Sequence, residues 1–196
     1  MTTVVKLGGS LAASGTLRSW LAAIERSRSA TRYVLVPGGG AFADTVRRMQ
    51  HRHGFSDAAA HRMALLAMEQ YALTLVDLAP WLALGESDEE IARAMSRRQP
   101  ICWLPARMVV ADPAIAADWK VTSDSLAAWL ARRIGAERLI LVKSAVPPEP
   151  APPPRRLAAL GLVDAAFPSY ADAFAGEIRC YGPGEEARLA GAPQAV

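Results

Sequence analysis

Two short apolar runs that end directly in glycine clusters constrain the fold of this chain more than any other feature of its sequence. Residues 3–7 (TVVKL) lead into the turn 8–10 (GGS), and residues 32–36 (RYVLV) lead through a proline into the turn 38–40 (GGG). β-Branched and apolar residues followed by glycine are typical of buried strands that end in tight turns. Helical periodicity follows both turns, so the sequence predicts strands that alternate with helices.

The rest of the chain continues this alternation. Helices are expected at 16–28, 41–52, 56–78, 87–97 and 123–134, and further strands at 101–104, 107–111, 138–142 and 177–181. The pieces within 101–111 are interpreted as a hairpin, and the proline-rich segment 147–154 (PPEPAPPP) as an extended loop. Alternating strands and helices indicate an α/β sandwich around a mainly parallel sheet, and 196 residues suit one domain with a single core.

Composition excludes several classes of protein. Hydrophobic residues make up 52% and charged residues 21%, which is typical of a folded chain and not of a disordered one. A net charge of +3, spread along the chain, gives no basis for nucleic-acid binding. No apolar run approaches the roughly 20 residues of a membrane-spanning helix. Without a signal-peptide pattern, a disulfide framework or a zinc-like spacing of ligands, we expect a cytoplasmic protein with no direct metal site.

Lysine is unusually rare in this sequence. Only Lys6, Lys120 and Lys143 are lysines among the 22 basic residues, and asparagine is absent. This bias is typical of GC-rich coding, under which a remaining lysine can mark a position that needs a compact ammonium group. Chance survival is the alternative for any one of them, but all three adjoin the motifs described here.

The two glycine turns are candidates for phosphate binding. At the carboxyl edge of a parallel sheet, glycines expose backbone N–H groups and let a phosphate approach closely, and a following helix adds its dipole. Lys6 lies two residues before Gly8, so its ammonium could reach the same phosphates. Neither turn matches a Walker A loop or a GxGxxG motif, and a tight turn without a ligand is the alternative for each.

Two further segments carry candidate polar side chains. Asp124 lies in the first turn of the helix expected at 123–134, where it stabilises the helix N-terminus, holds Lys6 in position or helps to place Mg²⁺. Lys143 and Ser144 follow the last residue of an expected strand and suit the ribose or phosphates of a nucleotide. A solvated strand end is the alternative for this pair.

In this order, the stretches VVKLGGS, VLVPGGG, VTSDSLAAWLA and LILVKSA resemble the amino acid kinase family over most of residues 1–145. The resemblance implies a three-layer α/β/α sandwich with a mainly parallel sheet of about eight strands. It implies one domain over 1–196, with an acceptor side at about 1–115 and a nucleotide side at about 116–196. It also implies a homo-oligomer, to which the helix at 56–78 contributes a contact or in which that helix is buried within the monomer.

The activity that the resemblance implies is transfer of the γ-phosphoryl group of ATP, with Mg²⁺, to a small acceptor. Lys6 would neutralise the transferring group, and Asp124 would organise the lysines. The other implied roles are ATP-phosphate binding by Gly8, Gly9, Ser10, Lys143 and Ser144, and acceptor binding by Gly38, Gly39, Gly40 and Ser123. Mg²⁺ would be held through the phosphates of ATP.

Within the family, GGGAFADTVR, VTSDSLAAWLA and GLVDAAFPSYA resemble the small archaeal-type kinase of methanofuran biosynthesis, which phosphorylates 5-(aminomethyl)-3-furanmethanol phosphate. This resemblance implies that the acceptor is a phosphate group. Asp44, one helical turn after Gly40, would pair with the ammonium of the substrate. Arg47 is the arginine chosen to bind its phosphate, and a solvated helix face is the alternative for Arg47. A phosphate monoester is already an anionic nucleophile, so no general base is required.

Departures from the family pattern leave alternatives open. No lysine follows Lys143 in this sequence, and the segment 147–154 replaces the usual Asp-Gly. Thr122 and Ser123 stand where relatives have an asparagine. The alternatives are a non-catalytic nucleotide-binding or regulatory member of the fold, and a kinase of another acceptor such as uridylate or isopentenyl phosphate.

Overall fold

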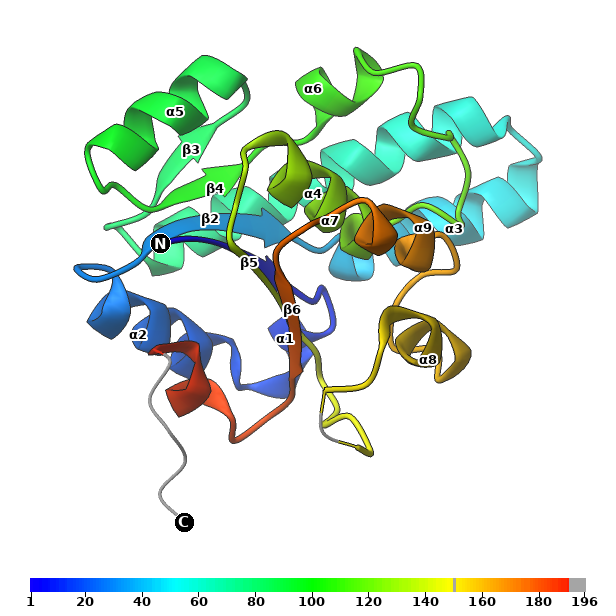
Figure 1. Ribbon diagram of the computed structural model, residues 1–196. Helices are drawn as coiled ribbons and strands as arrows, with labels where there is room; N and C mark the ends of the chain where they lie inside the picture. Colours follow the sequence, from blue (N-terminus) through cyan, green and yellow to red (C-terminus); the bar gives the residue numbers. More distant parts are fainter. Residues whose placement is uncertain (150, 191–196) are drawn as a thin grey trace.

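A six-stranded sheet lies between two layers of helices in the computed structural model of the chain, which describes residues 1–149 and 151–190 (Figure 1). The strands are β1 (Thr2–Leu7), β2 (Arg32–Pro37), β3 (Ala83–Gly85), β4 (Ile101–Trp103), β5 (Arg138–Val142) and β6 (Glu177–Tyr181). All neighbours pair in parallel, in the order β3-β4-β2-β1-β5-β6. The α/β class and the parallel sheet are confirmed, but the expected number of about eight strands is wrong for the described residues.

The helices that periodicity predicts are all present, with ends within one residue of those expected. They are α2 (Leu17–Ser27), α3 (Gly40–His53), α4 (Asp57–Leu78), α5 (Asp88–Ser96) and α7 (Ser123–Arg133). The remaining helices are α1 (Leu11–Ser14), α6 (Ala106–Val110), α8 (Pro154–Ala159), α9 (Phe167–Asp172) and the 3-10 helix η1 (Glu186–Ala190). Ser56 and Ser87 cap α4 and α5 by accepting the N–H of the third residue that follows, which is how a serine caps a helix.

The hairpin expected within residues 101–111 is wrong, because only its first half is a strand. The second half forms the short helix α6 instead. The N–H of Ala106, its first residue, donates to the Glu69 carboxylate on α4 at 2.9 Å. A helical turn buries Met108 and Val109 together, whereas a strand would send these neighbours to opposite faces.

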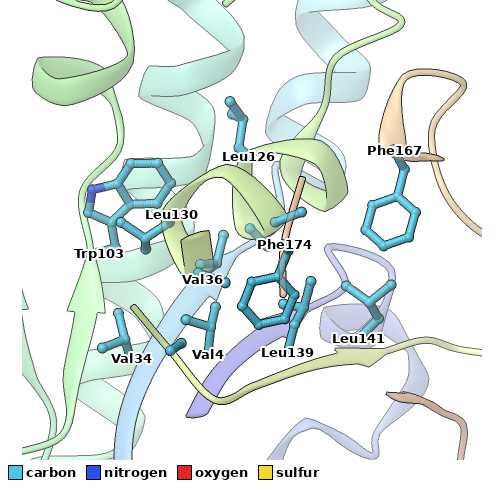
Figure 2. Packing of buried hydrophobic residues seen from close by; sticks show 14 of the residues in the cluster. Val4, Val34, Val36, Trp103, Leu126, Leu130, Leu139, Leu141, Phe167 and Phe174 are labelled. Carbon is cyan, nitrogen blue, oxygen red and sulfur yellow. The ribbon is translucent and has the colours of Figure 1, made fainter. Parts of the chain in front are cut away.

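The core consists of two clusters, one on each face of the sheet, because successive residues of a strand point to opposite faces. Val4, Leu139 and Leu141 face the layer that contains α7, and Figure 2 shows them packed beneath it. Val5 and Ile140 face the other layer, which contains α2 and η1. The helix α4 is long enough to contribute side chains to both clusters.

The neighbouring strands β1 and β5 are followed by helices on opposite faces of the sheet. The chain leaves β1 through α1 and α2 on one face, and it leaves β5 through α8 and α9 on the other. Ligands of open parallel sheets bind at the carboxyl edge, between neighbouring strands whose connections lie on opposite faces in this way. The helix α7 packs on both of these strands, so side chains from its first turn can reach this edge.

The long helix α4 is largely a core element of the monomer. It buries Leu65, Met68 and Leu75, whereas Leu66 and Leu73 are exposed. The homo-oligomer contact expected on this helix stays a prediction. Within the described ranges 1–149 and 151–190, none of the helices combines the length with the hydropathy that crossing a bilayer requires.

Candidate functional site

The register of β1 and β5 places Lys6 and Lys143 on one face of the sheet. Lys6 is aligned with Leu141, so Lys143 lies two residues further along on the neighbouring strand, directly after the end of β5. Residues two apart on a strand share a face, and this face is the one that α7 covers. Both lysines are buried there.

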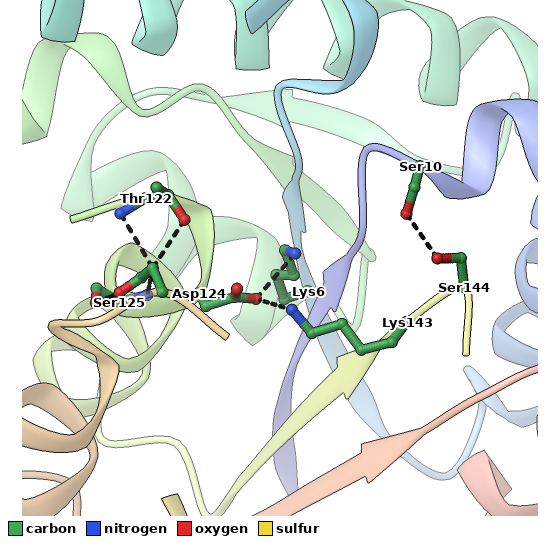
Figure 3. A network of polar contacts seen from close by, with 8 residues as sticks. Lys6, Ser10, Thr122, Asp124, Ser125, Lys143 and Ser144 are labelled. Atoms are coloured by element: carbon green, nitrogen blue, oxygen red, sulfur yellow. Dashed lines mark hydrogen bonds and ion pairs between the residues drawn. The ribbon is translucent and has the colours of Figure 1, made fainter. Parts of the chain in front are cut away.

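Asp124, in the first turn of α7, lies between the two ammonium groups. Its Oδ1 atom is 2.8 Å from Nζ of Lys6 and 2.6 Å from Nζ of Lys143 (Figure 3). The side chains of Lys6, Lys143 and Asp124 are only 6%, 11% and 7% exposed. Two positive charges against one negative charge leave one net positive charge among these three buried groups, which is the charge balance of a site for an anion.

Burial and mutual charge shift the pKa values of this cluster. Burial alone would raise the pKa of the Asp124 carboxyl, but the charges and hydrogen bonds of the two lysines outweigh burial and hold that pKa below its ordinary value. Burial, followed by the charge of Lys6, lowers the pKa of Lys143 to about 8, although Asp124 opposes the shift. An anion bound beside Lys143 would favour its charged form, so phosphate binding and protonation of Lys143 are linked.

The two glycine turns touch each other backbone to backbone. A Cβ atom on Gly9 would lie 2.1 Å from the backbone nitrogen of Gly40, and one on Gly38 would lie 2.2 Å from the backbone nitrogen of Gly9. Gly40 also has a φ of +52°, in the left-handed region. The turns after β1 and β2 therefore form one continuous edge that admits no side chain at these positions.

Hydrogen bonds already use two of the N–H groups in these turns. The N–H of Gly8 donates to the carbonyl of Val142 at 3.0 Å, and the N–H of Gly38 donates to the carbonyl of Leu7 at 2.8 Å. These bonds extend the pairing of the strands by one residue on either side of β1. A phosphate cradle therefore has to draw on other N–H groups, of which the N–H of Gly9 comes next in the turn.

Side-chain hydroxyls also link the turn after β1 to the turn after β5. Ser10 Oγ donates to Ser144 Oγ at 3.1 Å, as Figure 3 shows. Both residues are exposed. The turns on the two sides of the lysine cluster are thus joined directly across the carboxyl edge.

A cavity of about 500 Å³ opens beside the glycine turns. Of the residues predicted for a site, Gly9, Ser10, Gly39, Gly40, Asp44, Arg47 and Ser123 line it. Lys6, Asp124 and Lys143 lie outside its lining, as do Gly8, Gly38 and Ser144. The predicted residues therefore fall into two neighbouring places, the cavity and the lysine cluster, which meet at Gly9, Ser10 and the start of α7.

The walls of the cavity combine apolar side chains with carboxylates. Asp57 and Asp118 line it together with the predicted Asp44. Arg47 lies on its rim with its guanidinium carbon 4.5 Å from the centre of the Trp119 ring, which is a cation–π contact. This arrangement suits a small molecule that carries a positive charge at one end.

Three titratable lining residues were not predicted as site residues from the sequence. Asp57 is the first residue of α4, where an acid is explained by the helix dipole alone. Asp118 lies in an irregular segment with no periodicity to guide an interpretation. Burial lowers the pKa of His61, although Asp118 opposes the shift. His61 lies on α4, and no motif in the sequence marks it.

A comparison of sequences finds a distant relative of this chain. The [5-(aminomethyl)furan-3-yl]methyl phosphate kinase of Methanocaldococcus jannaschii is 22% identical over 140 residues, which cover 70% of this chain and 63% of that relative. The match thus spans less than two thirds of the relative's length.

Two solved structures are similar along almost the whole chain. The uridylate kinase of Archaeoglobus fulgidus has a TM-score of 0.73 at 17% identity, covering 98% of this chain and 96% of that one. The UMP kinase of Bacillus anthracis has a TM-score of 0.72 at 11% identity, covering 96% and 91%. At these identities the similarity shows a shared fold.

A family-wide match extends over most of the chain. The sequence pattern described as the amino acid kinase family matches residues 1–145. This range contains both glycine turns, the first turn of α7 and Lys143. The resemblance found in the sequence is thereby confirmed, and the chain belongs to the amino acid kinase family.

Proposed function

We propose that this protein is an ATP-dependent kinase that transfers the γ-phosphoryl group to the phosphate of a small, aminated acceptor. The observation that carries the proposal is the shared oxygen of Asp124, which holds two buried ammonium groups at the carboxyl edge, beside the joined glycine turns. Phosphoryl transfer needs positioning and charge neutralisation more than covalent chemistry from the protein, and these residues supply both.

The residues present fit a triphosphate. Gly9, Gly39 and Gly40 line the cavity without a side chain, so an anion in the cavity can approach their backbone. The excess positive charge of the lysine cluster would be balanced by a phosphate. Among the described residues, no group of three or more histidine, cysteine or acidic side chains could hold a metal ion. Mg²⁺ would therefore arrive with ATP, where it neutralises charge on the β- and γ-phosphates.

The cavity next to the lysine cluster would hold the acceptor. The first residues of α3, Gly40 and Ala41, line it, and a helix N-terminus favours a phosphate. The carboxylates of Asp44, Asp57 and Asp118 in the same walls favour an ammonium group. An aminomethyl-bearing phosphate ester meets both requirements, which supports the substrate in the name of the Methanocaldococcus jannaschii relative as the first acceptor to test.

A coupled assay of ADP release tests this proposal. The unchanged chain is mixed with MgATP and, separately, with [5-(aminomethyl)furan-3-yl]methyl phosphate, UMP and isopentenyl phosphate. We expect turnover with the furan phosphate and much less with the two acceptors that lack an ammonium group. Turnover with UMP alone would leave a kinase but refute the acceptor, and no turnover with any phosphate would refute the kinase.

A variant of Asp44 tests the ammonium contact. Asp44→Asn should raise KM for the aminated acceptor about tenfold, because one charge-assisted contact is worth roughly 1.5–3 kcal/mol. KM for an analogue in which hydroxymethyl replaces aminomethyl should stay nearly unchanged. Equal changes for both acceptors would remove Asp44 from ammonium recognition and leave Asp57 and Asp118 as the next variants to make.

A non-catalytic nucleotide-binding protein is the second candidate. The observation that favours it is the absence of any lysine after Lys143 in the sequence. This candidate predicts ATP binding in calorimetry without phosphorylation of any acceptor. Turnover in the assay above would eliminate it.

A further inference from the structure

A carboxylate from a distant segment holds the start of α7. Asp164, in the connection between α8 and α9, accepts the N–H of Thr122 at 3.0 Å, the hydroxyl of Thr122 at 2.8 Å and the N–H of Ser125 at 3.0 Å. The hydroxyl of Ser125 also donates to it. All four donors come from two residues that are 42 and 39 positions earlier in the chain.

These contacts replace the cap that α7 does not make for itself. Thr122 is the N-cap residue, yet its side chain forms no capping bond within the helix. Its hydroxyl is donated outward to Asp164 instead. The first N–H groups of a helix need acceptors, and here one carboxylate from another segment satisfies the helix start.

The residues that Asp164 holds flank the acid of the lysine cluster. Thr122 and Ser125 lie two positions before and one position after Asp124, and Figure 3 shows all three at the same helix start. These bonds hold the backbone on both sides of Asp124, and with it the point from which the Asp124 side chain reaches the lysines. Both lysines bind the same oxygen of Asp124, so a small rotation of this turn would break two ion pairs together.

We propose that Asp164 is a positioning residue, which fixes the first turn of α7 so that Asp124 stays between Lys6 and Lys143. It touches neither lysine and is placed to act through Asp124 alone. Its importance for phosphoryl transfer rests on the proposed kinase function, whereas its effect on the lysine cluster does not.

Charge is not required of Asp164 in this role, because its contacts are all with neutral donors. In Asp164→Asn, the amide oxygen can accept the three bonds now made to Oδ2, while the amide nitrogen donates to the Ser125 hydroxyl. In Asp164→Glu the charge stays, but one more methylene displaces the acceptor. Asp164→Ala removes the acceptor altogether.

The matched control is Glu69, which also caps a helix from a separate element. Its carboxylate accepts the N–H of Ala106, the first residue of α6, at 2.9 Å. The helix α6 contributes no side chain to the lysine cluster. Glu69→Ala therefore tests whether loss of any external cap, rather than loss of this one, changes the site.

The state of the cluster can be measured without an activity assay, because the chain has only three lysines. Labelling lysine with ¹³C at Cε gives three NMR signals, and Lys120→Arg assigns one of them. The titratable groups that bear on Lys143 are Lys6 on β1, Asp124 on α7 and Cys180 on β6. Asp124 raises the pKa of Lys143, so displacement of Asp124 lowers the titration midpoint of Lys143.

We expect Asp164→Asn to keep the Lys143 midpoint and at least half of kcat. Asp164→Ala and Asp164→Glu should lower the midpoint by about one pH unit and kcat by about tenfold or more, since misplacing a charged group in a site by about 1 Å can cost a hundredfold. Glu69→Ala should change neither quantity. If Asp164→Ala does not fold, as circular dichroism would show, the comparison of Asn with Glu decides.

The proposal is overturned if folded Asp164→Ala keeps both the wild-type midpoint and kcat. It is also overturned if Asp164→Asn loses as much as Asp164→Ala, because the charge and not the geometry would then matter. If the unchanged chain has no kinase activity, the proposed function fails, and the NMR midpoints alone still decide whether Asp164 positions Asp124.

Discussion

The Oδ1 atom of Asp124 sets the electrostatics of the candidate site at the scale of single residues. Lys6 and Lys143 both bind it, so removing either lysine leaves a neutral buried pair. Removing Asp124 leaves two buried like charges, which is far more costly because neither ammonium keeps a partner. The cluster therefore tolerates the loss of a lysine better than the loss of its acid.

Replacing the first lysine tests the chemistry without unfolding the chain. If the chain is the proposed kinase, Lys6→Ala should lower kcat by about 100-fold or more, because one preorganised charge at the transferring phosphoryl group would be lost. The free energy of unfolding should change little, since Asp124 keeps Lys143. Steady-state kinetics and urea denaturation measure the two quantities.

The exposed Lys120→Ala is the control for this substitution. It removes the same side chain from a position outside the cluster, so we expect wild-type kcat. Full activity of Lys6→Ala would show that Lys6 takes no part in the reaction.

The lowered pKa of Lys143 predicts opposite pH trends for stability and activity. Burial, followed by the charge of Lys6, lowers this pKa to about 8, so between about pH 8 and the ordinary lysine value the unfolded chain binds more protons than the folded one. The contribution of Lys143 to the free energy of unfolding therefore rises with pH across this window, by about 3 kcal/mol at most. Activity should fall across the same window as the ammonium is lost.

Lys143→Met isolates this effect from the other titrating groups. Urea denaturation at pH 7.5 and pH 10 should show a smaller rise in unfolding free energy for the variant than for the wild type. Identical pH dependence in the two proteins would mean that Lys143 has an ordinary pKa.

The sequence predicts part of the site because lysine is rare and glycine is clustered. Lys6, Asp124 and Lys143 stand at the ends of recognisable elements, and the structure brings them together. Asp164 could not be found in this way, because it belongs to no element and its partners lie about 40 residues away. A capping acid that comes from elsewhere in the fold leaves no local pattern.

At the scale of helices, strands and turns, the contact between the two glycine turns determines how the parts of the candidate site lie relative to each other. The turns after β1 and β2 pack so closely that their backbones touch at Gly9. A substitution there displaces an entire turn and not one side chain. The same closeness keeps the cavity and the lysine cluster next to each other.

Gly9→Ala tests this contact. The added methyl group would lie 2.1 Å from a backbone nitrogen, so we expect a loss of about 2 kcal/mol or more in unfolding free energy, as for other overpacked sites. Gly15→Ala is the control, because Gly15 has a φ of +71° and open space around it, and only the backbone strain of about 1–2 kcal/mol applies. A cost for Gly9→Ala no greater than that for Gly15→Ala, measured by urea denaturation, would contradict the contact.

Long periodic elements were predictable, whereas some short ones, such as β3 and α6, were not. The helices α4 and α7 have an apolar pattern and end signals that local physics explains. The three-residue strand β3 is too short for any period, and α6 contains two valines that favour a strand until Glu69 caps its first residue. The described part of the proline-rich segment leads to Pro154, which begins α8 because proline suits a first helical turn.

The placement of the connections after β1 and β5 on opposite faces of the sheet organises the molecule as a whole. It brings residues from the first and the later parts of the chain to one edge, where Ser10 meets Ser144. Local patterns predicted the parallel sheet but not the order of its strands, because short parallel connections leave open on which side each new strand is added. The family resemblance supplied the fold that periodicity could not.

MgATP should stabilise this edge selectively. At a ligand concentration 100 times Kd, the free energy of unfolding should rise by about 2.7 kcal/mol. Hydrogen exchange should slow most in the turns after β1 and β5 and in the first turn of α7, and least at β3 and α5 on the far edge. Protection confined to that far edge would place the nucleotide elsewhere.

The central place of β1 has a consequence for biosynthesis. The strand β5, which pairs with β1, and Asp124 of α7 are synthesised long after β1, since Ser10 and Ser144 are 134 residues apart. At synthesis rates of about 5–20 residues per second, a nascent chain exposes one open side of β1 for roughly 7–27 seconds. Throughout that interval Lys6 is a solvated charge beside the apolar residues of β1, which disfavours pairing of this edge with other nascent chains until its own partners arrive.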